Sequence, residues 1–131
     1  MQGSKGVQLQ AIISAWSPDI ITGDFNGPLD LVNAKKMISR NAAAQGLTEK
    51  EKALFAKYLI SHAITAEDNG YSAAFTAEQV GSTSSEGNPD WIFYNPKNLG
   101  VSAVSVLDLV GSQLFNHNGV IVTFAIVSDS D

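Results

Sequence analysis

The segment LTEKEKALFAKYLISHAIT, residues 47–65, gives the clearest structural signal in this chain of 131 residues. Thr48 is followed three residues later by Glu51, the capping-box spacing in which each side chain accepts a hydrogen bond from the other residue's backbone N–H. Apolar residues then recur every three or four positions, as they do along the buried face of an amphipathic helix. The sequence therefore predicts a helix over residues 49–65.

A second helix is predicted immediately upstream, over residues 28–45. Pro28 suits the first position of a helix, where a missing N–H costs nothing, and Asp30 would lie in the first turn, where a negative charge is favourable. Apolar residues follow at helical spacing as far as Gly46, a residue type that commonly ends helices. Because so few residues separate the two helices, we expect them to form a helical hairpin.

Strands are predicted on both sides of this hairpin. Residues 7–15 begin with an alternation of apolar and glutamine side chains, the two-residue period of a strand with one wetted face. WIFY, residues 91–94, is a short apolar run closed by the turn sequence NPKN. Between them, residues 72–80 favour a short helix, and the polar residues 81–90 have the composition of a loop.

The C-terminal segment VIVTFAIV, residues 120–127, is apolar on both faces, which is typical of a central strand covered on each side. Asn118 and Gly119 precede it, a pair that tolerates the positive φ angles of a tight hairpin turn. Residues 101–115 fit either a strand, which we prefer, or one face of a helix.

Together these elements predict an α+β fold, an antiparallel sheet of about four strands packed against the helical hairpin. The length of the chain suits a single compact domain spanning residues 1–131, since a chain of this size can bury a substantial core.

Composition and motifs exclude several classes of site. The chain has no cysteine, so it has no disulfide, no thiolate nucleophile and no cysteine-ligated metal. No H-E-x-x-H, G-x-S-x-G or phosphate-binding glycine pattern occurs, and we predict no catalytic residue, metal ligand or cofactor. Without an apolar leader or a membrane-spanning stretch, the expected location is the cytoplasm or a virion assembled there.

Charge is distributed unevenly along the chain. Residues 35–57 hold six basic residues against two acidic ones, a formal charge of +4, whereas the remainder holds two basic residues against eleven acidic ones, a formal charge of −9. Opposite charges on two regions favour contact with another copy or with an acidic partner. The predicted partner-binding residues are Lys35, Lys36, Arg40, Lys50, Lys52 and Lys57.

The two histidines have different sequence contexts. His62 shares an apolar stripe with Phe55 and Leu59, which predicts a packed side chain with one satisfied nitrogen. A chemical role for it would need a carboxylate partner. His117 lies between two asparagines, which predicts an exposed turn residue without a function.

These observations favour a non-enzymatic assembly or interaction module, such as a structural subunit of a viral or other macromolecular particle, that binds a protein partner or associates with itself. Three alternatives stay open: a small acidic inhibitor or immunity-type protein, an RNA-binding particle component that uses the basic hairpin, and a small hydrolase that uses His62 with a carboxylate.

Overall fold

The computed structural model describes residues 4–84, 88–111, 113 and 115–127. Its elements follow the chain in the order α1 (Ser4–Trp16), β1 (Ile20–Asp24), α2 (Leu31–Arg40), the 3₁₀ helix η1 (Ala42–Ala44), α3 (Glu49–Leu59), α4 (Ser61–Asp68), β2 (Ser72–Ala73), α5 (Ala77–Val80), β3 (Asp90–Tyr94), β4 (Leu99–Leu107) and β5 (Gly119–Ile126). The fold is α+β, as predicted, with one antiparallel sheet in the order β1-β3-β2 and a second antiparallel pair, β4-β5. None of the described helices has the length and apolar character needed to cross a membrane.

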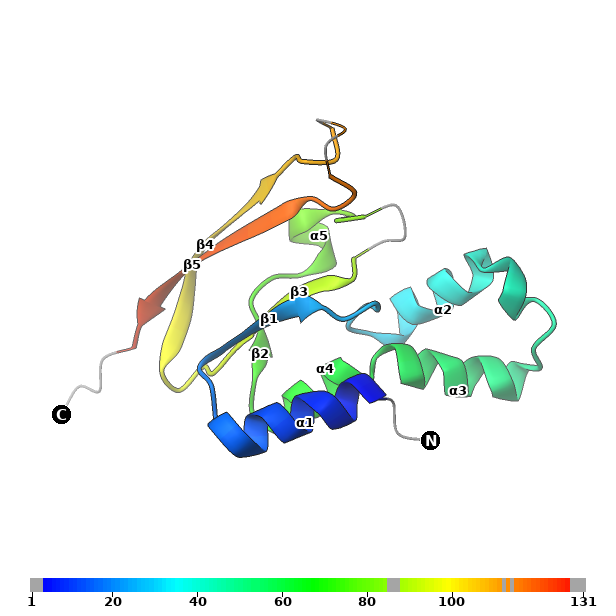
Figure 1. Ribbon diagram of the computed structural model, residues 1–131, viewed down its shortest axis with the longest axis horizontal. Coiled ribbons are helices and arrows are strands. Elements are labelled where there is room, and N and C mark those ends of the chain that lie inside the picture. The colour runs from blue at the N-terminus through cyan, green and yellow to red at the C-terminus, as the bar shows by residue number, and fades with distance from the viewer. Residues whose placement is uncertain (1–3, 85–87, 112, 114, 128–131) are drawn as a thin grey trace.

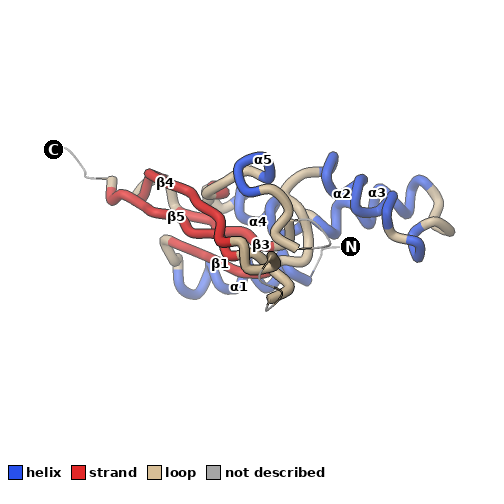
Figure 2. Tube along the Cα trace, turned by 90° about the horizontal axis from the view of Figure 1, so that it is seen from above, coloured by secondary structure: helices blue, strands red, loops and turns tan. Residues whose placement is uncertain are grey.

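The structure has three layers, and the three-stranded sheet is the middle one. Helices α1 and α4 lie on one side of it and the β4-β5 ribbon lies on the other (Figure 1; Figure 2). In the central strand β3, the side chains of Trp91 and Phe93 are each only 2% exposed. Tyr94 instead contacts Phe124 of β5, with ring centroids 5.5 Å apart. The strand predicted at residues 91–94 is therefore confirmed and forms the middle of the main core.

The strand predicted over residues 7–15 is wrong, because this segment is the helix α1. Gly6, Leu9 and Ile13 recur at helical spacing and are all buried. A Cβ atom on Gly6 would lie 2.9 Å from the Thr65 hydroxyl, so this glycine lets α1 approach α4 closely. The alternation of apolar and polar residues over a few positions resembled a strand pattern, but packing against α4 favours the helix.

The helix predicted over residues 28–45 is present but shorter. Asp30 is the N-cap of α2 and not a first-turn residue, because its Oδ1 accepts a hydrogen bond of 2.8 Å from the backbone N–H of Asn33. Pro28 consequently lies before the helix. Asn41 ends α2 and caps the short helix η1 with its side chain.

The helix predicted over residues 49–65 begins as expected but divides in two. Both capping-box hydrogen bonds between Thr48 and Glu51 are present. The helix breaks at Ile60, and the Leu59 carbonyl accepts a hydrogen bond of 2.9 Å from the Lys5 ammonium. Because of this break, α3 packs on α2 as the predicted hairpin, while α4 packs on α1.

The hairpin has a small core of its own, separate from the main one. Its buried residues are Ala34, Ile38, Ala44, Ala56, Leu59 and Ile60. In Figure 1 the hairpin extends away from the sheets.

The last strand, β5, is present but is not central, because it pairs only with β4 among the described strands. Half-buried Val120, Val122 and Phe124 alternate with exposed residues on the opposite face. The tight turn at Asn118 and Gly119 is also wrong: residues 108–118 join the strands, and neither residue of the pair has a positive φ.

The two remaining predictions for this half of the chain are confirmed in part. Strand β4 (Leu99–Leu107) covers the first half of the segment 101–115, for which a strand was preferred, but it begins two residues earlier and ends at Leu107. The helix predicted over residues 72–80 is confined to the four residues of α5, where Thr76 and Gln79 form a second capping box.

Candidate functional site

His117 is hydrogen-bonded and does not project freely from a turn. Its Nδ1 lies 2.7 Å from Oδ2 of Asp90, the first residue of β3. Its backbone forms an isolated antiparallel bridge with Ser84, and its side chain is 32% exposed. The prediction of an exposed turn residue is therefore corrected in one respect, because His117 is only partly exposed and its side chain is hydrogen-bonded to the sheet.

A second carboxylate, that of Asp24, faces the other ring nitrogen. Asp24 ends β1 and is the cross-strand partner of Asp90. Its Oδ2 lies 3.9 Å from Nε2 of His117, and its Oδ1 accepts a hydrogen bond of 2.9 Å from the backbone N–H of Asn26. Asp90 Oδ2 also accepts a hydrogen bond of 2.8 Å from the hydroxyl of the fully buried Thr83. Three separate segments thus bring one imidazole and two carboxylates together.

These three side chains have the donor chemistry of a metal site. One ligand atom from each of Asp24, Asp90 and His117 lies within 4.8 Å of the others. A hollow of about 190 Å³ adjoins Asp24 and His117 and is also lined by Asn26, Ser84 and Asn116. The arrangement can therefore hold a small cation or orient a polar molecule.

His62 has the opposite environment. It is completely buried and stacks on Phe25 with ring centroids 5.0 Å apart. Neither ring nitrogen makes a hydrogen bond within the described part of the chain. The predicted packing is confirmed, but the predicted satisfied nitrogen is not.

Burial determines the protonation state of His62. Desolvation, and to a smaller extent the positive charge of Lys5, lowers the pKa of His62 from its ordinary 6.5 to about 3, and backbone groups of Gly27 and Pro28 oppose this shift. The ring is therefore neutral at pH 7. Because it is completely buried, it gives no support to a hydrolase built on His62.

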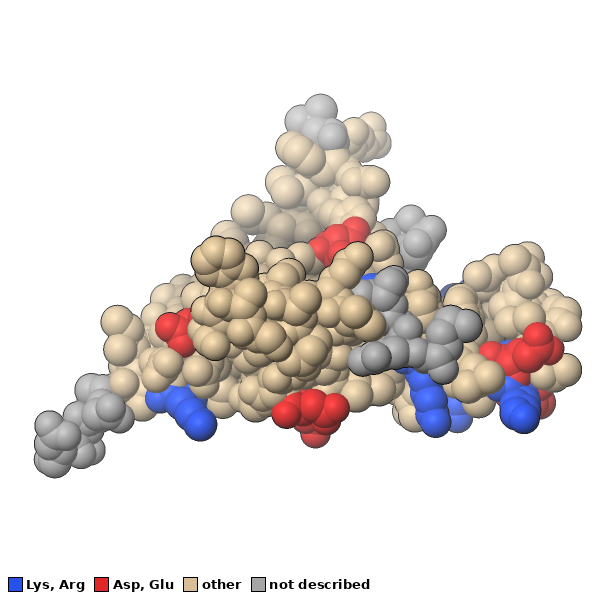
Figure 3. All heavy atoms as spheres, turned by 60° about the horizontal axis from the view of Figure 1, so that its bottom comes forward, with Lys and Arg blue, Asp and Glu red and all other residues tan. Residues whose placement is uncertain are grey.

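The predicted basic residues divide between the two helices of the hairpin. Lys35, Lys36 and Arg40 lie on α2, and Lys50, Lys52 and Lys57 lie on α3. Only Lys52 is partly buried, and its ammonium lies 3.5 Å from the Glu49 carboxylate. Figure 3 shows basic and acidic side chains interspersed at the hairpin end, so this end is less uniformly positive than the sequence total suggests.

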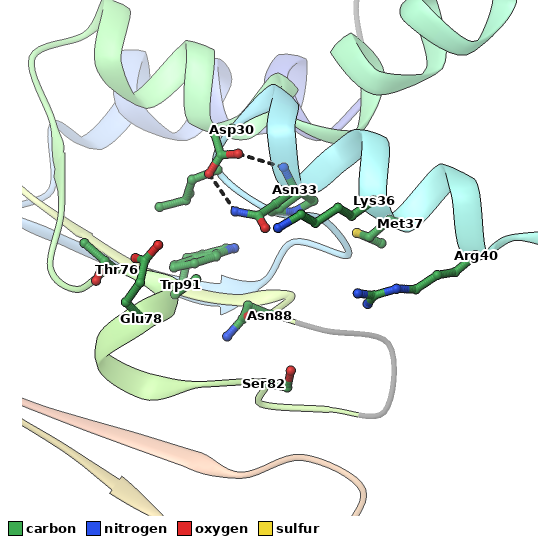
Figure 4. Close-up of a pocket in the computed structure, with 13 residues that line it drawn as sticks. Asp30, Asn33, Lys36, Met37, Arg40, Thr76, Glu78, Ser82, Asn88 and Trp91 are labelled. Atoms are coloured by element: carbon green, nitrogen blue, oxygen red, sulfur yellow. Dashed lines mark hydrogen bonds between the residues drawn. The ribbon is translucent and has the colours of Figure 1, made fainter.

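Two of the six basic residues also line a groove between the hairpin and α5. Lys36 and Arg40 share it with Trp91, and Asp30 and Glu78 are among its other walls (Figure 4). Its volume is about 290 Å³. The Trp91 Nε1 already donates a hydrogen bond of 2.8 Å to the Gly27 carbonyl, so the indole contributes a surface to the groove and no free donor.

Sequence reasoning named His117 but missed its partners, Asp24 and Asp90. Each aspartate ends or begins a strand, yet only the pairing of β1 with β3 places them opposite each other. Comparisons with known protein families, with curated proteins and with solved structures gave no significant match.

Proposed function

We propose that this chain is a non-enzymatic assembly module that associates with a second copy of itself along the edge of strand β5. The observation that carries the proposal is the charge-free β4-β5 ribbon. Residues 99–107 and 119–127 contain no Asp, Glu, Lys or Arg. Natural sheets usually guard open edges with charged residues, proline or bulges, because an open edge otherwise pairs with another strand.

The two strands of this ribbon and the loop beside them also expose apolar side chains, although Asp108, directly after β4, is exposed and charged. Large apolar residues exposed there are Val106, Leu107, Val110, Phe115, Ile121, Ile126 and Val127. Contiguous exposed apolar surface marks interaction sites more often than it marks free surface. A partner that covers the ribbon would remove this surface from water.

The edge of β5 suits pairing better than the edge of β4. Strand β4 has a register irregularity between Val101 and Ala103 and is contacted by α5, and both features hinder a further strand. Strand β5 has eight residues, enough for a regular ladder. Two copies related by a two-fold axis would pair their β5 strands antiparallel and form a four-stranded sheet.

The test is sedimentation velocity over a range of protein concentrations. Ile121→Lys places a charge on the exposed face of β5, and Ser105→Lys is the matched control because Ser105 is the cross-strand partner of Ile121 on β4. We expect wild type to dimerise, Ile121→Lys to be monomeric and Ser105→Lys to retain the dimer. A wild type that stays monomeric at every concentration overturns the proposal. If both variants lose the dimer equally, the copies pack through the face of the ribbon and not through the edge of β5.

A second candidate contact is the basic hairpin, acting on an acidic partner or on the acidic remainder of another copy. Apart from Lys52, its basic side chains are exposed and make no ion pair with the described residues. Salt weakens such a contact, because the screening length falls from about 10 Å at 0.1 M to about 3 Å at 1 M. Association along β5 is instead expected to resist salt.

Reversing the charges of Lys36 and Arg40 tests this second contact. These residues lie one helical turn apart on the same face of α2, so the double variant changes that face from positive to negative. Lys97→Glu is the control, because Lys97 is one of the two basic residues outside the hairpin segment. The other, Lys5, is unsuitable because it is half-buried and bonded to the Leu59 carbonyl. Association that the double reversal abolishes supports the hairpin, and association seen only when RNA is added selects the nucleic-acid alternative. Indifference to salt, RNA and the reversal excludes the hairpin contact.

A further inference from the structure

We propose that Asp24, Asp90 and His117 form a site for a divalent transition-metal ion of the zinc type. In this assignment His117 Nε2 and the Asp24 carboxylate bind the ion directly, and Asp90 orients the imidazole. The inference rests on the geometry at the ends of β1 and β3 and does not depend on self-association.

The orientation of His117 is the first argument. Asp90 Oδ2 lies 2.7 Å from Nδ1, and because a carboxylate oxygen accepts hydrogen bonds, we assign the tautomer in which Nδ1 carries the proton. In this tautomer Nε2 has a free lone pair and lies 3.9 Å from Oδ2 of Asp24. Metal-binding histidines commonly donate their other N–H to a carboxylate in this way, which fixes the ring and raises its basicity.

Both carboxylates are also fixed by hydrogen bonds. The hydroxyl of buried Thr83 donates to Asp90 Oδ2, so Asp90 is committed to positioning the ring. The backbone N–H of Asn26 binds Asp24 Oδ1 and leaves Oδ2 directed at His117. Each proposed ligand is therefore fixed through the atom that does not face the ion.

The distance between the two ligand atoms fits a shared cation. Asp24 Oδ2 and His117 Nε2 are 3.9 Å apart. Zinc lies about 2.0–2.2 Å from imidazole nitrogen and carboxylate oxygen, so one ion can contact both atoms, and a small closure gives a tetrahedral angle. The hollow of about 190 Å³ beside Asp24 and His117 leaves room for water on the remaining positions.

Charge also favours a cation here. Asp24 and Asp90 are directly opposite each other in the antiparallel pair, and like charges in that position destabilise a sheet. Imidazole with carboxylate suits zinc and its neighbours, whereas calcium and magnesium prefer sites made of oxygen ligands alone. The donor set therefore indicates a transition metal.

The experiment titrates untagged, chelator-treated protein with ZnCl₂ by calorimetry, and in parallel follows the imidazole nitrogens by NMR. We expect one zinc ion per chain and a shift of the His117 Nε2 signal, while Nδ1 stays protonated. His62 is an internal control within the same spectrum, because its buried ring cannot reach the ion. Titration with MgCl₂ under the same conditions should give no comparable binding.

Variants separate the direct ligands from the orienting residue. His117→Asn and Asp24→Asn should each weaken zinc binding at least tenfold, and Asp90→Asn should weaken it about 10-fold to 100-fold through the lost orientation of the ring. Asp68→Asn, an exposed aspartate at the end of α4, should leave the affinity unchanged.

Three results overturn the proposal. They are zinc affinity no better than millimolar, equal affinity for magnesium, and zinc binding that all three site variants leave intact. Circular dichroism of each variant confirms that the fold survives. If Asp90→Asn unfolds the protein, His117→Asn and Asp24→Asn still decide, since both residues are partly exposed.

Discussion

The two histidines lie in two regions of the molecule that give the same side chain opposite environments. In the buried centre, the ring of His62 on α4 contacts Phe25 and Phe93 and is completely shielded from water. At the rim, His117 lies between two carboxylates at the ends of β1 and β3. The difference teaches that burial is the main reason why His62 is neutral, whereas His117 remains partly exposed beside two carboxylates.

The largest expected effect comes from protonating the buried centre. The pKa of His62 is about 3 in the folded chain and 6.5 when unfolded, so the unfolded state binds the extra proton. The stability linked to His62 is therefore complete above pH 6.5 and is lost as the pH falls toward 3. Between pH 7 and pH 4 this loss amounts to about 3 kcal/mol.

Urea unfolding of wild type and His62→Leu at pH 7, 5.5 and 4 measures this loss. The carboxylates of the chain titrate in both proteins, so the difference between them isolates His62. The variant should lose about 3 kcal/mol less than wild type between pH 7 and pH 4. Equal acid sensitivity in the two proteins would mean that the ring reaches solvent.

The second largest effect tests how tightly the buried centre is packed. A Cβ atom on Gly27 would lie 2.1 Å from the Leu59 carbonyl oxygen, a backbone atom that cannot move away easily. Gly27→Ala should therefore destabilise the fold by about 1–3 kcal/mol. Gly46→Ala is the control, because nothing lies within 4 Å of its added Cβ. Chemical denaturation of both variants measures their free energies of unfolding. Equal values would show that the backbone near Leu59 moves to accommodate the added methyl group.

Sequence reasoning succeeded where a signal acts within one segment. The capping box of Thr48 and Glu51 and the two helices of the hairpin are examples. It failed where tertiary contacts decide. The break at Ile60 occurs where Lys5 binds the Leu59 carbonyl, a contact between residues that are distant in the sequence. Local periodicity contains no information about such a contact.

The same limit applies to the candidate sites. The apolar stripe around His62 correctly predicted its burial, since neighbours on one helix face share one environment. The asparagines beside His117 gave no sign of Asp24 or Asp90, because these lie in strands that the chain brings together only on folding. Likewise, the apolar run of β5 indicated a covered strand, but one of its faces is open.

A smaller effect is expected at the rim. His117→Ala removes the hydrogen bond to Asp90 and leaves two carboxylates opposite each other, which should cost about 1–2 kcal/mol in metal-free buffer. Asp24→Asn removes one of those charges and should be neutral or stabilising. Thermal unfolding with a chelator present measures both. A His117→Ala protein as stable as wild type would show that the loop is held by its backbone contacts.

The smallest effect separates the two causes that keep His62 neutral. Burial is the larger cause and the charge of half-buried Lys5 is the smaller one. Lys5→Met removes the charge and also the hydrogen bond to the Leu59 carbonyl, which should cost about 1 kcal/mol at every pH. The stability lost between pH 7 and pH 4 is thus the informative quantity. It should shrink by less than half, because desolvation of the ring stays. If Lys5→Met abolished the acid sensitivity, charge and not burial would control the centre, and the contrast with His117 would become one of charge sign alone.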